Sequence, residues 1–94
     1  MISTNEWLNV LPALENVERF NILLMLVEKR RMAFSQVLKE RELTPGNCAY
    51  HLNKLMKAGL IDNSYQTPTE PSKEYSFYGP TDLGRRVIEK LLAP

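Results

Sequence analysis

The first strong pattern of apolar positions lies between residues 15 and 30. Its spacing of three to four residues predicts an amphipathic helix, and the positions are Val17, Phe20, Leu24 and Val27. The run LLMLV at 23–27 fills the gaps between them, so this helix is apolar on nearly all sides. One core cannot bury such a helix. We therefore expect a second cover, either the N-terminal apolar segment before Pro12, at residues 7–11, or another copy of the chain.

Two shorter helices are predicted from capping residues. Ser35 is expected to cap a short helix, SQVLKERE, with Val37 and Leu38 on its buried side. Thr81 is expected to cap the last helix. The apolar stripe of that last helix consists of Leu83, Val87, Ile88, Leu91 and Leu92.

The segment LTPGNCAYHLNKLMKAGL, residues 43–60, predicts a helix that is bounded at both ends. Thr44 can cap it, and Pro45 suits the first helical position, where its missing N–H costs nothing. Gly59 suits the left-handed residue that ends a helix. At about 100° per residue, the core side of this helix contains Cys48, Leu52, Leu55 and Met56.

The opposite side of the same helix is polar and lacks acidic residues. It contains Gly46, Asn47, Tyr50, Asn53, Lys54 and Lys57. A solvated helix face usually mixes in Asp or Glu for local ion pairs, yet residues 43–61 contain neither. This face therefore suits an anion.

Two strand-like segments follow the bounded helix. LIDNSY (60–65) and EYSFYG (74–79) are short and partly alternating. Between them, Pro68 and Pro71 interrupt any regular structure. We predict a two-stranded hairpin with a long tip.

Composition limits the chain to one small domain. Its 94 residues, 44% of them hydrophobic, are enough for a single core over residues 1–94. The net charge of +1 gives no overall preference for nucleic acid. No apolar run approaches the roughly 20 residues of a membrane span, and we expect a soluble, cytoplasmic protein with no membrane partner. No Gly-rich phosphate loop, carboxylate pair or nucleophile with a base is visible, so neither an enzyme nor a cofactor is expected.

The single cysteine and the single histidine can be packed residues, or they can have a role in metal binding or redox chemistry. One Cys excludes an intrachain disulfide, and Cys48 with His51 supplies too few ligands for a structural zinc site. We interpret both as packed residues and expect no metal. A redox-sensitive thiol at Cys48, close to a helix N-terminus, is the alternative. The basic run at 29–31 fits the C-terminal end of a helix dipole, or a contact with DNA phosphate.

A short helix, a tight turn and a capped second helix form a helix-turn-helix, and the hairpin beyond it is a wing. This order resembles the winged helix-turn-helix transcriptional regulators. Within them it is most similar to the small archaeal and bacterial regulators related to the MarR and ArsR types. The resemblance covers residues 16–92, and its specific pieces are LTPGN, HLNKLMKAGLI and TDLGRR.

The resemblance implies an α+β, mainly helical winged helix-turn-helix fold that binds double-stranded DNA as a dimer. By that pattern, the helix contacts map onto Thr44, Gly46, Asn47, Tyr50 and Lys54, to which the polar face adds Lys57. The wing contact maps onto Lys73. Because Lys73 lies next to Glu74 and near Glu70, we expect it to contribute less than Lys54. The helix at 35–42 lacks the metal-binding cysteines of ArsR regulators, so metal sensing there is not expected.

Apolar residues are in surplus at both ends of the chain. Residues 1–14 and 81–94 contain more apolar side chains than one small core buries, which predicts a homodimer through these segments. No small-molecule effector is assigned. The near-neutral charge and the acidic wing favour the alternative function, a winged-helix module that binds a protein partner.

Overall fold

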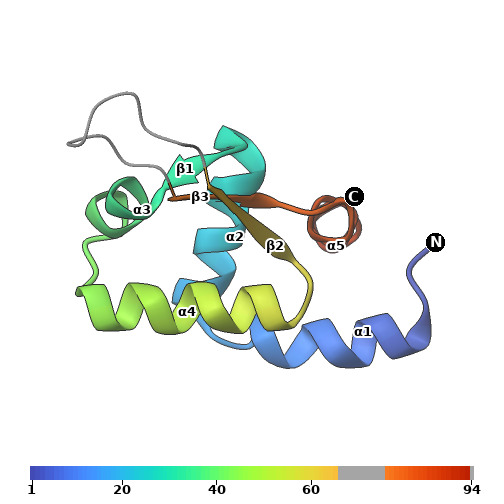
Figure 1. Ribbon diagram of the computed structural model, residues 1–94. Coiled ribbons are helices and arrows are strands. Elements are labelled where there is room, and N and C mark those ends of the chain that lie inside the picture. Colours follow the sequence, from blue (N-terminus) through green and yellow to red (C-terminus); the bar gives the residue numbers. More distant parts are fainter. Residues whose placement is uncertain (66–75, 94) are drawn as a thin grey trace.

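Helix α2 (Val17–Lys29) stands at the centre of the fold (Figure 1). The computed structural model describes residues 1–65 and 76–93. The other helices are α1 (Thr4–Val10), the 3-10 helix η1 (Leu11–Leu14), α3 (Phe34–Glu40), α4 (Pro45–Lys57) and α5 (Asp82–Leu92). The strands are β1 (Met32–Ala33), β2 (Ile61–Tyr65) and β3 (Ser76–Pro80). None of the described helices is long and apolar enough to cross a membrane.

The inner side of α2 differs from the predicted stripe. Ile22, Leu23 and Leu26 are completely buried. Val17, which the spacing placed on the buried side, is 76% exposed, and the other three stripe residues are only partly buried. The reason is that η1, α4, α5 and β3 all pack against α2. At about 100° per residue, Ile22, Leu23 and Leu26 lie on one side of the helix, so α2 has a single fully buried stripe, but on a different side from the predicted one. Periodicity alone gave the wrong register because the neighbouring elements decide which side is covered.

The N-terminal segment supplies the second cover of α2. Ser3 caps α1 by accepting the Glu6 N–H, and the Glu6 carboxylate accepts the Ser3 N–H in return. Val10 and Ala13 are buried in the main core, and η1 lies against α2. Of the two predicted covers, the chain's own N-terminal segment is therefore present, but it acts mainly through η1 and not through residues 7–11, of which Leu8 and Leu11 are exposed.

Helix α3 begins two residues earlier than the predicted cap implies. Ala33, not Ser35, is the residue before the first turn, and the Gln36 side chain accepts its N–H at 2.8 Å. Ala33 is held in an extended conformation because it belongs to β1, where it pairs with Phe77. The helix begins where the strand ends, which places Ser35 inside the first turn.

The sheet contains the predicted hairpin and one strand more. Strands β2 and β3 pair antiparallel, from Ile61 opposite Pro80 to Tyr65 opposite Ser76. Strand β1 pairs with the other edge of β3, so the order is β1-β3-β2. Two residues are too few to show a period, which explains why β1 was not predicted. The tip of the wing and Lys73 lie outside the described residues.

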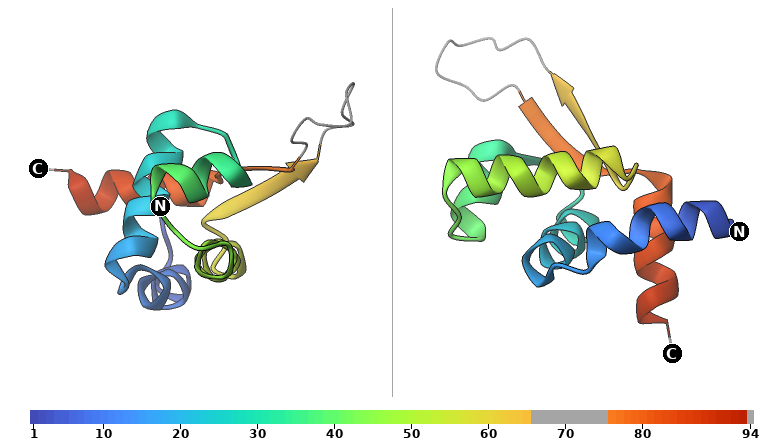
Figure 2. Two further views of the ribbon diagram at one scale, coloured as in Figure 1. Left: turned by 90° about the vertical axis from the view of Figure 1, so that its left-hand side faces the viewer. Right: turned by 90° about the horizontal axis from the view of Figure 1, so that it is seen from below.

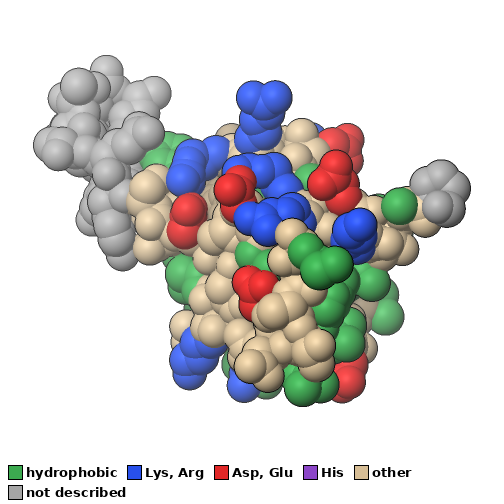
Figure 3. Space-filling view, turned by 90° about the vertical axis from the view of Figure 1, so that its right-hand side faces the viewer, with side chains coloured by type: hydrophobic (Ala, Val, Ile, Leu, Met, Phe, Trp, Pro, Cys, Tyr) green, Lys and Arg blue, Asp and Glu red, His purple; other side chains and the backbone are tan. Residues whose placement is uncertain are grey.

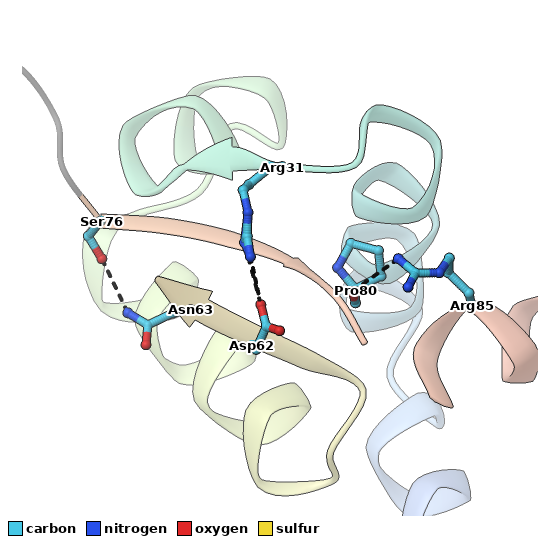
Figure 4. A network of polar contacts seen from close by, with 6 residues as sticks. All are labelled: Arg31, Asp62, Asn63, Ser76, Pro80 and Arg85. Atoms are coloured by element: carbon cyan, nitrogen blue, oxygen red, sulfur yellow. Dashed lines mark hydrogen bonds and ion pairs between the residues drawn. The ribbon is translucent and has the colours of Figure 1, made fainter. Parts of the chain in front are cut away.

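An ion pair crosses the sheet above Gly79 (Figure 4). Arg31, just before β1, reaches over β3 to the Asp62 carboxylate on β2, with an N–O distance of 3.1 Å. Gly79 is the β3 partner of Asp62, and a Cβ there would lie 2.7 Å from the Arg30 carbonyl oxygen and 3.2 Å from the Arg31 guanidinium. The glycine therefore allows the close passage of Arg31 that joins all three strands.

The hairpin and α5 extend in opposite directions (Figure 2). In both views of Figure 2, α4 lies between them. The molecule is elongated, with extents of 44 × 24 × 24 Å. One side of the molecule thus presents α4 and the wing, and the other presents α5.

Gly84 allows α5 to approach the end of α4, and its substitution is expected to destabilise the fold. The Cβ of Gly84→Ala would collide with the Leu60 carbonyl oxygen, which is backbone and cannot rotate away. We expect a loss of about 1–3 kcal/mol in the free energy of unfolding, the usual cost of overpacking. Urea denaturation measures it.

Gly46→Ala is the matched control, because no atom lies within 4 Å of its Cβ position. Removing a helical glycine there is expected to leave stability unchanged or raise it by up to about 1 kcal/mol. Equal destabilisation of the two variants would show that the contact with Leu60 is not the cause.

Candidate nucleic-acid interface

Both ends of α4 are fixed by the residues that the sequence predicted. The Thr44 hydroxyl accepts the Asn47 N–H at 3.2 Å, and Pro45 occupies the first turn. Gly59 has a φ of +79° and follows the last turn. These predictions are confirmed, and they fix which residues of α4 face outward.

The two faces of α4 are also as predicted. Cys48, Leu52 and Leu55 are buried, and Met56 is partly buried against the core. We call the opposite side the outer face of α4. Its residues are Thr44, Gly46, Asn47, Tyr50, Asn53, Lys54 and Lys57, and all of them are exposed.

The turn before α4 is tied to α2. Arg41 donates to the two carboxylate oxygens of Glu18 at 2.6 and 3.3 Å. This hydrogen bond to Glu18 raises the pKa of Arg41 above its ordinary value. The Leu43 N–H donates to the Leu38 carbonyl at 3.0 Å, and Glu42 takes a φ of +53° to close the turn. These contacts hold the turn between α3 and α4 against the central helix α2, and they restrict the angle between α3 and α4.

Tyr50 lies among cationic and aromatic neighbours on one flank of the outer face. The Lys54 ammonium is 5.5 Å from the centre of its ring, and the Arg19 guanidinium carbon is 6.0 Å from it. The His51 ring meets Tyr50 edge-on at 5.5 Å. Although Tyr50 is 55% exposed, its side chain therefore contacts neighbours that orient it.

A pocket of about 280 Å³ opens beside this flank, between η1 and α4. Arg19 and Asn9 contribute to its wall together with Tyr50, Lys54 and Lys57. No sequence pattern indicates a role for Arg19 or Asn9, because each belongs to a different helix and looks like part of a solvated face. Only the packing of η1 against α2 brings them to α4.

His51 and Cys48 are packed residues, as predicted. The Arg19 guanidinium lies 3.4 Å from Nδ1 of His51. Burial, and then the charge of Arg19, lower the pKa of His51 below its ordinary value. Cys48 is completely buried, and burial raises its pKa to about 11. This direction is opposite to the lowered pKa of a redox-sensitive thiol.

The basic run at 29–31 has mainly structural roles in the described fold. Lys29 lies in the last turn of α2, and Arg30, with a φ of +75°, ends that helix. Arg31 is engaged by Asp62. The helix-dipole interpretation therefore fits Lys29, and Arg31 serves the sheet.

Residues 19–62 match the family model for winged helix-turn-helix DNA-binding domains. This stretch runs from α2 through the helix-turn-helix to the start of β2. No curated protein sequence matches the chain. The winged helix-turn-helix fold predicted from the sequence is confirmed.

Several solved structures have the same fold. A transcriptional regulator homologue from Pyrococcus horikoshii OT3 is 27% identical, with a TM-score of 0.76 over 96% of this chain and 89% of that chain. HlyU from Vibrio cholerae N16961 is 19% identical, with a TM-score of 0.73 over 97% of this chain and 96% of its own. The homodimeric winged helix-turn-helix domain of Mb0332 from Mycobacterium bovis, a possible ArsR-family regulator, is 18% identical, with a TM-score of 0.73 over 93% and 75%.

The lowered pKa of His51 predicts a loss of stability in mild acid. Because the folded state binds this proton less tightly than the unfolded state, stability rises with pH. It is therefore expected to fall as the pH drops below about 6.5, the ordinary histidine value. Urea denaturation between about pH 7.5 and 5.5 measures this loss.

His51→Gln keeps hydrogen-bonding capacity but does not titrate in this range. Since His51 is the only histidine of the chain, this variant is expected to have a flatter dependence on pH. Identical slopes for the variant and the wild type would assign the effect to other groups.

Proposed function

We propose that this chain, which contains a winged helix-turn-helix DNA-binding domain, is a sequence-specific transcriptional regulator of double-stranded DNA. It acts as a homodimer and places α4 in the major groove. A major groove about 12 Å wide accommodates one α-helix. The observation that carries the proposal is the outer face of α4, which is exposed, polar and free of acidic residues over residues 43–61.

The residues of the outer face divide into two roles. Asn47 offers an amide that can pair with adenine, and Tyr50 offers a ring and a hydroxyl to base edges. Lys54 and Lys57, near the C-terminal end of α4, suit phosphates. Thr44 and Gly46 allow the first turn to approach the duplex, since nothing lies within 4 Å of the Cβ position of Gly46. Lys73 of the wing is proposed to add one weaker contact.

A salt series with random-sequence duplex DNA tests the proposal against the alternative, a module that binds a protein. Each neutralised phosphate contributes about 0.9 to the slope of log K against log salt. A regulator is expected to show a steep slope, and stronger binding to a duplex selected from a random pool. Absence of binding in low salt would favour the protein-binding module.

Substitutions on the outer face are expected to separate the two roles. Asn47→Ala and Tyr50→Ala should lose preference for the selected duplex, because a good side-chain contact with a base edge contributes about 1–3 kcal/mol of discrimination. Lys54→Ala and Lys57→Ala should weaken binding to all duplexes alike and lower the salt slope by about one unit each. Fluorescence anisotropy with selected and random duplexes measures both effects.

Asn63 is the matched amide control, because it is on β2 and donates to the Ser76 hydroxyl at 3.3 Å. Asn63→Ala is expected to retain the sequence preference. If Asn47→Ala and Tyr50→Ala bind the selected duplex at wild-type strength, α4 is not the reading element.

The proposed dimer interface is the apolar surface at the two ends of the chain. Figure 3 views the side that carries both termini in Figure 1, and hydrophobic side chains gather on its lower right. Exposed apolar side chains at the two ends of the chain are Met1, Leu8, Leu11, Leu91 and Leu92. A two-fold axis lets one such patch serve both partners. The homodimeric state of the Mb0332 domain supports a dimer, whose interface we assign to residues 1–14 and 81–94.

A dimer of this kind suits an inverted repeat. Because α5 and the hairpin extend in opposite directions, pairing through α5 leaves α4 and the wing free in both subunits (Figure 2). Two recognition helices about 34 Å apart read successive major grooves on one side of the duplex. We therefore expect the selected duplex to contain two related half-sites.

Leu91→Glu is expected to dissociate the dimer, because it places a charge in the apolar patch. Leu91 is 42% exposed, so the substitution leaves the core of the subunit intact. Sedimentation equilibrium at micromolar concentration should find twice the chain mass of 10.9 kDa for the wild type and the single mass for the variant. Ala49→Glu, at an exposed position of α4, is the control that should remain dimeric. A wild type with the mass of one chain would contradict the proposal.

A further inference from the structure

The pocket between η1 and α4 has a strongly cationic wall. Its volume is about 280 Å³. Its lining residues are Asn9, Pro12, Ala13, Arg19, Tyr50, Lys54, Lys57 and Ala58, which include three cations and, among the described residues, no carboxylate. Three positive charges that share one small pocket repel each other and favour a bound anion.

Arg19 is held in place before any ligand arrives. Its Nε donates to the Ala13 carbonyl at 2.5 Å, and its Nη1 lies 3.4 Å from Nδ1 of His51. Within the described part of the chain, Nη2 has no hydrogen-bond partner. A guanidinium fixed in this way loses little conformational freedom when it binds an oxyanion, and its planar group of donors matches phosphate oxygens.

Two further features reduce the negative potential around the pocket. The Asn9 side chain donates to the Ala58 carbonyl at 3.4 Å. This hydrogen bond engages one of the carbonyls that have no partner within α4 at its C-terminal end. Glu18, the nearest acid in sequence to Arg19, is paired with Arg41 at the turn before α4. Among the described residues, Arg19, Lys54 and Lys57 therefore form no ion pair with a carboxylate.

We propose that this pocket is a phosphate-binding site formed jointly by η1, α2 and α4. Its volume lies just below the roughly 300–1,000 Å³ of small-molecule sites, so it suits a phosphate that carries a short organic group. Two sources share this chemistry: a backbone phosphate of DNA bound to α4, and a free phosphorylated small molecule. The first source depends on the function proposed above, whereas the second does not.

Lys54 and Lys57 belong both to this pocket and to the outer face of α4. A free phosphate compound in the pocket therefore competes with DNA for the same two ammonium groups. A backbone phosphate in the pocket instead adds Arg19, from outside the helix-turn-helix, to the DNA contacts.

The first experiment titrates the full chain with inorganic phosphate, without DNA, against chloride at equal ionic strength. Nuclear magnetic resonance follows the Arg19 Nε–H and the Asn9 side-chain amide. Phosphate is expected to shift both signals in a saturable way. Arg19→Gln and Lys57→Gln should each weaken binding about tenfold, the loss expected for one charge-assisted hydrogen bond.

Arg86→Gln is the matched control, because Arg86 is exposed on α5 and does not line the pocket. It is expected to bind phosphate as the wild type does. Lys57→Gln leaves the bonds from Arg19 to Ala13 and His51 in place, so it tests the pocket even if Arg19→Gln unfolds. Unmoved signals, or equal weakening by Arg86→Gln, would overturn the proposal.

The second experiment identifies the source of the phosphate. If DNA supplies it, Arg19→Gln lowers the salt slope of DNA binding by about one unit. If a free compound supplies it, the slope is unchanged and inorganic phosphate displaces DNA from the wild type more than from Arg19→Gln. A chain that binds phosphate but no DNA would refute the proposed regulator function and leave the pocket assignment intact.

Discussion

The burial of α2 is the constraint on which the rest of the structure depends. Ile22, Leu23 and Leu26 are inaccessible to solvent, and burying each such side chain contributes about 1.5–3 kcal/mol. The partly buried residues Phe20, Leu24 and Val27 lie on another side of the helix, so no single neighbour can cover all of its apolar surface. The chain meets this requirement by packing η1, α4, α5 and β3 around one helix. The positions of the outer face of α4 and of the pocket beside it both depend on this arrangement.

The outer face of α4 follows from that packing. Helix α4 contributes only a narrow stripe to the core, with Leu52 and Leu55 at its centre, so its remaining surface must face solvent. At its C-terminal end, the Thr81 hydroxyl donates to the Gly59 carbonyl at 2.6 Å and also caps α5 by accepting the Gly84 N–H at 3.0 Å. One threonine thus sets the start of α5 relative to the end of α4, and it connects the proposed dimer element to the proposed reading element.

Features that depend on local chemistry, such as helix caps, could be predicted from the sequence. Features that depend on tertiary contacts could not. Thr44, Gly59 and Thr81 were assigned correctly because a cap or a left-handed residue needs only its own turn. Ser35 has the chemistry of a cap, but the pairing of Ala33 in β1 places the start of α3 two residues earlier. The contact between Arg19 and His51 joins residues 32 positions apart, so no periodicity could reveal it. The outer face of α4 was therefore predictable, whereas the pocket beside it was not.

The distribution of ion pairs explains how a nearly neutral chain can attract DNA. Three arginines, Arg31, Arg41 and Arg85, are paired with carboxylates within the fold. Arg19, Lys54 and Lys57 have no such partner among the described residues, and they gather along one flank of α4. A net charge of +1 is therefore compatible with a local positive field along this flank, which belongs to the proposed DNA-binding surface. Because folding pairs three of the six arginines with carboxylates and brings Arg19 to Lys54 and Lys57, this local field depends on the folded state and cannot be predicted from the composition.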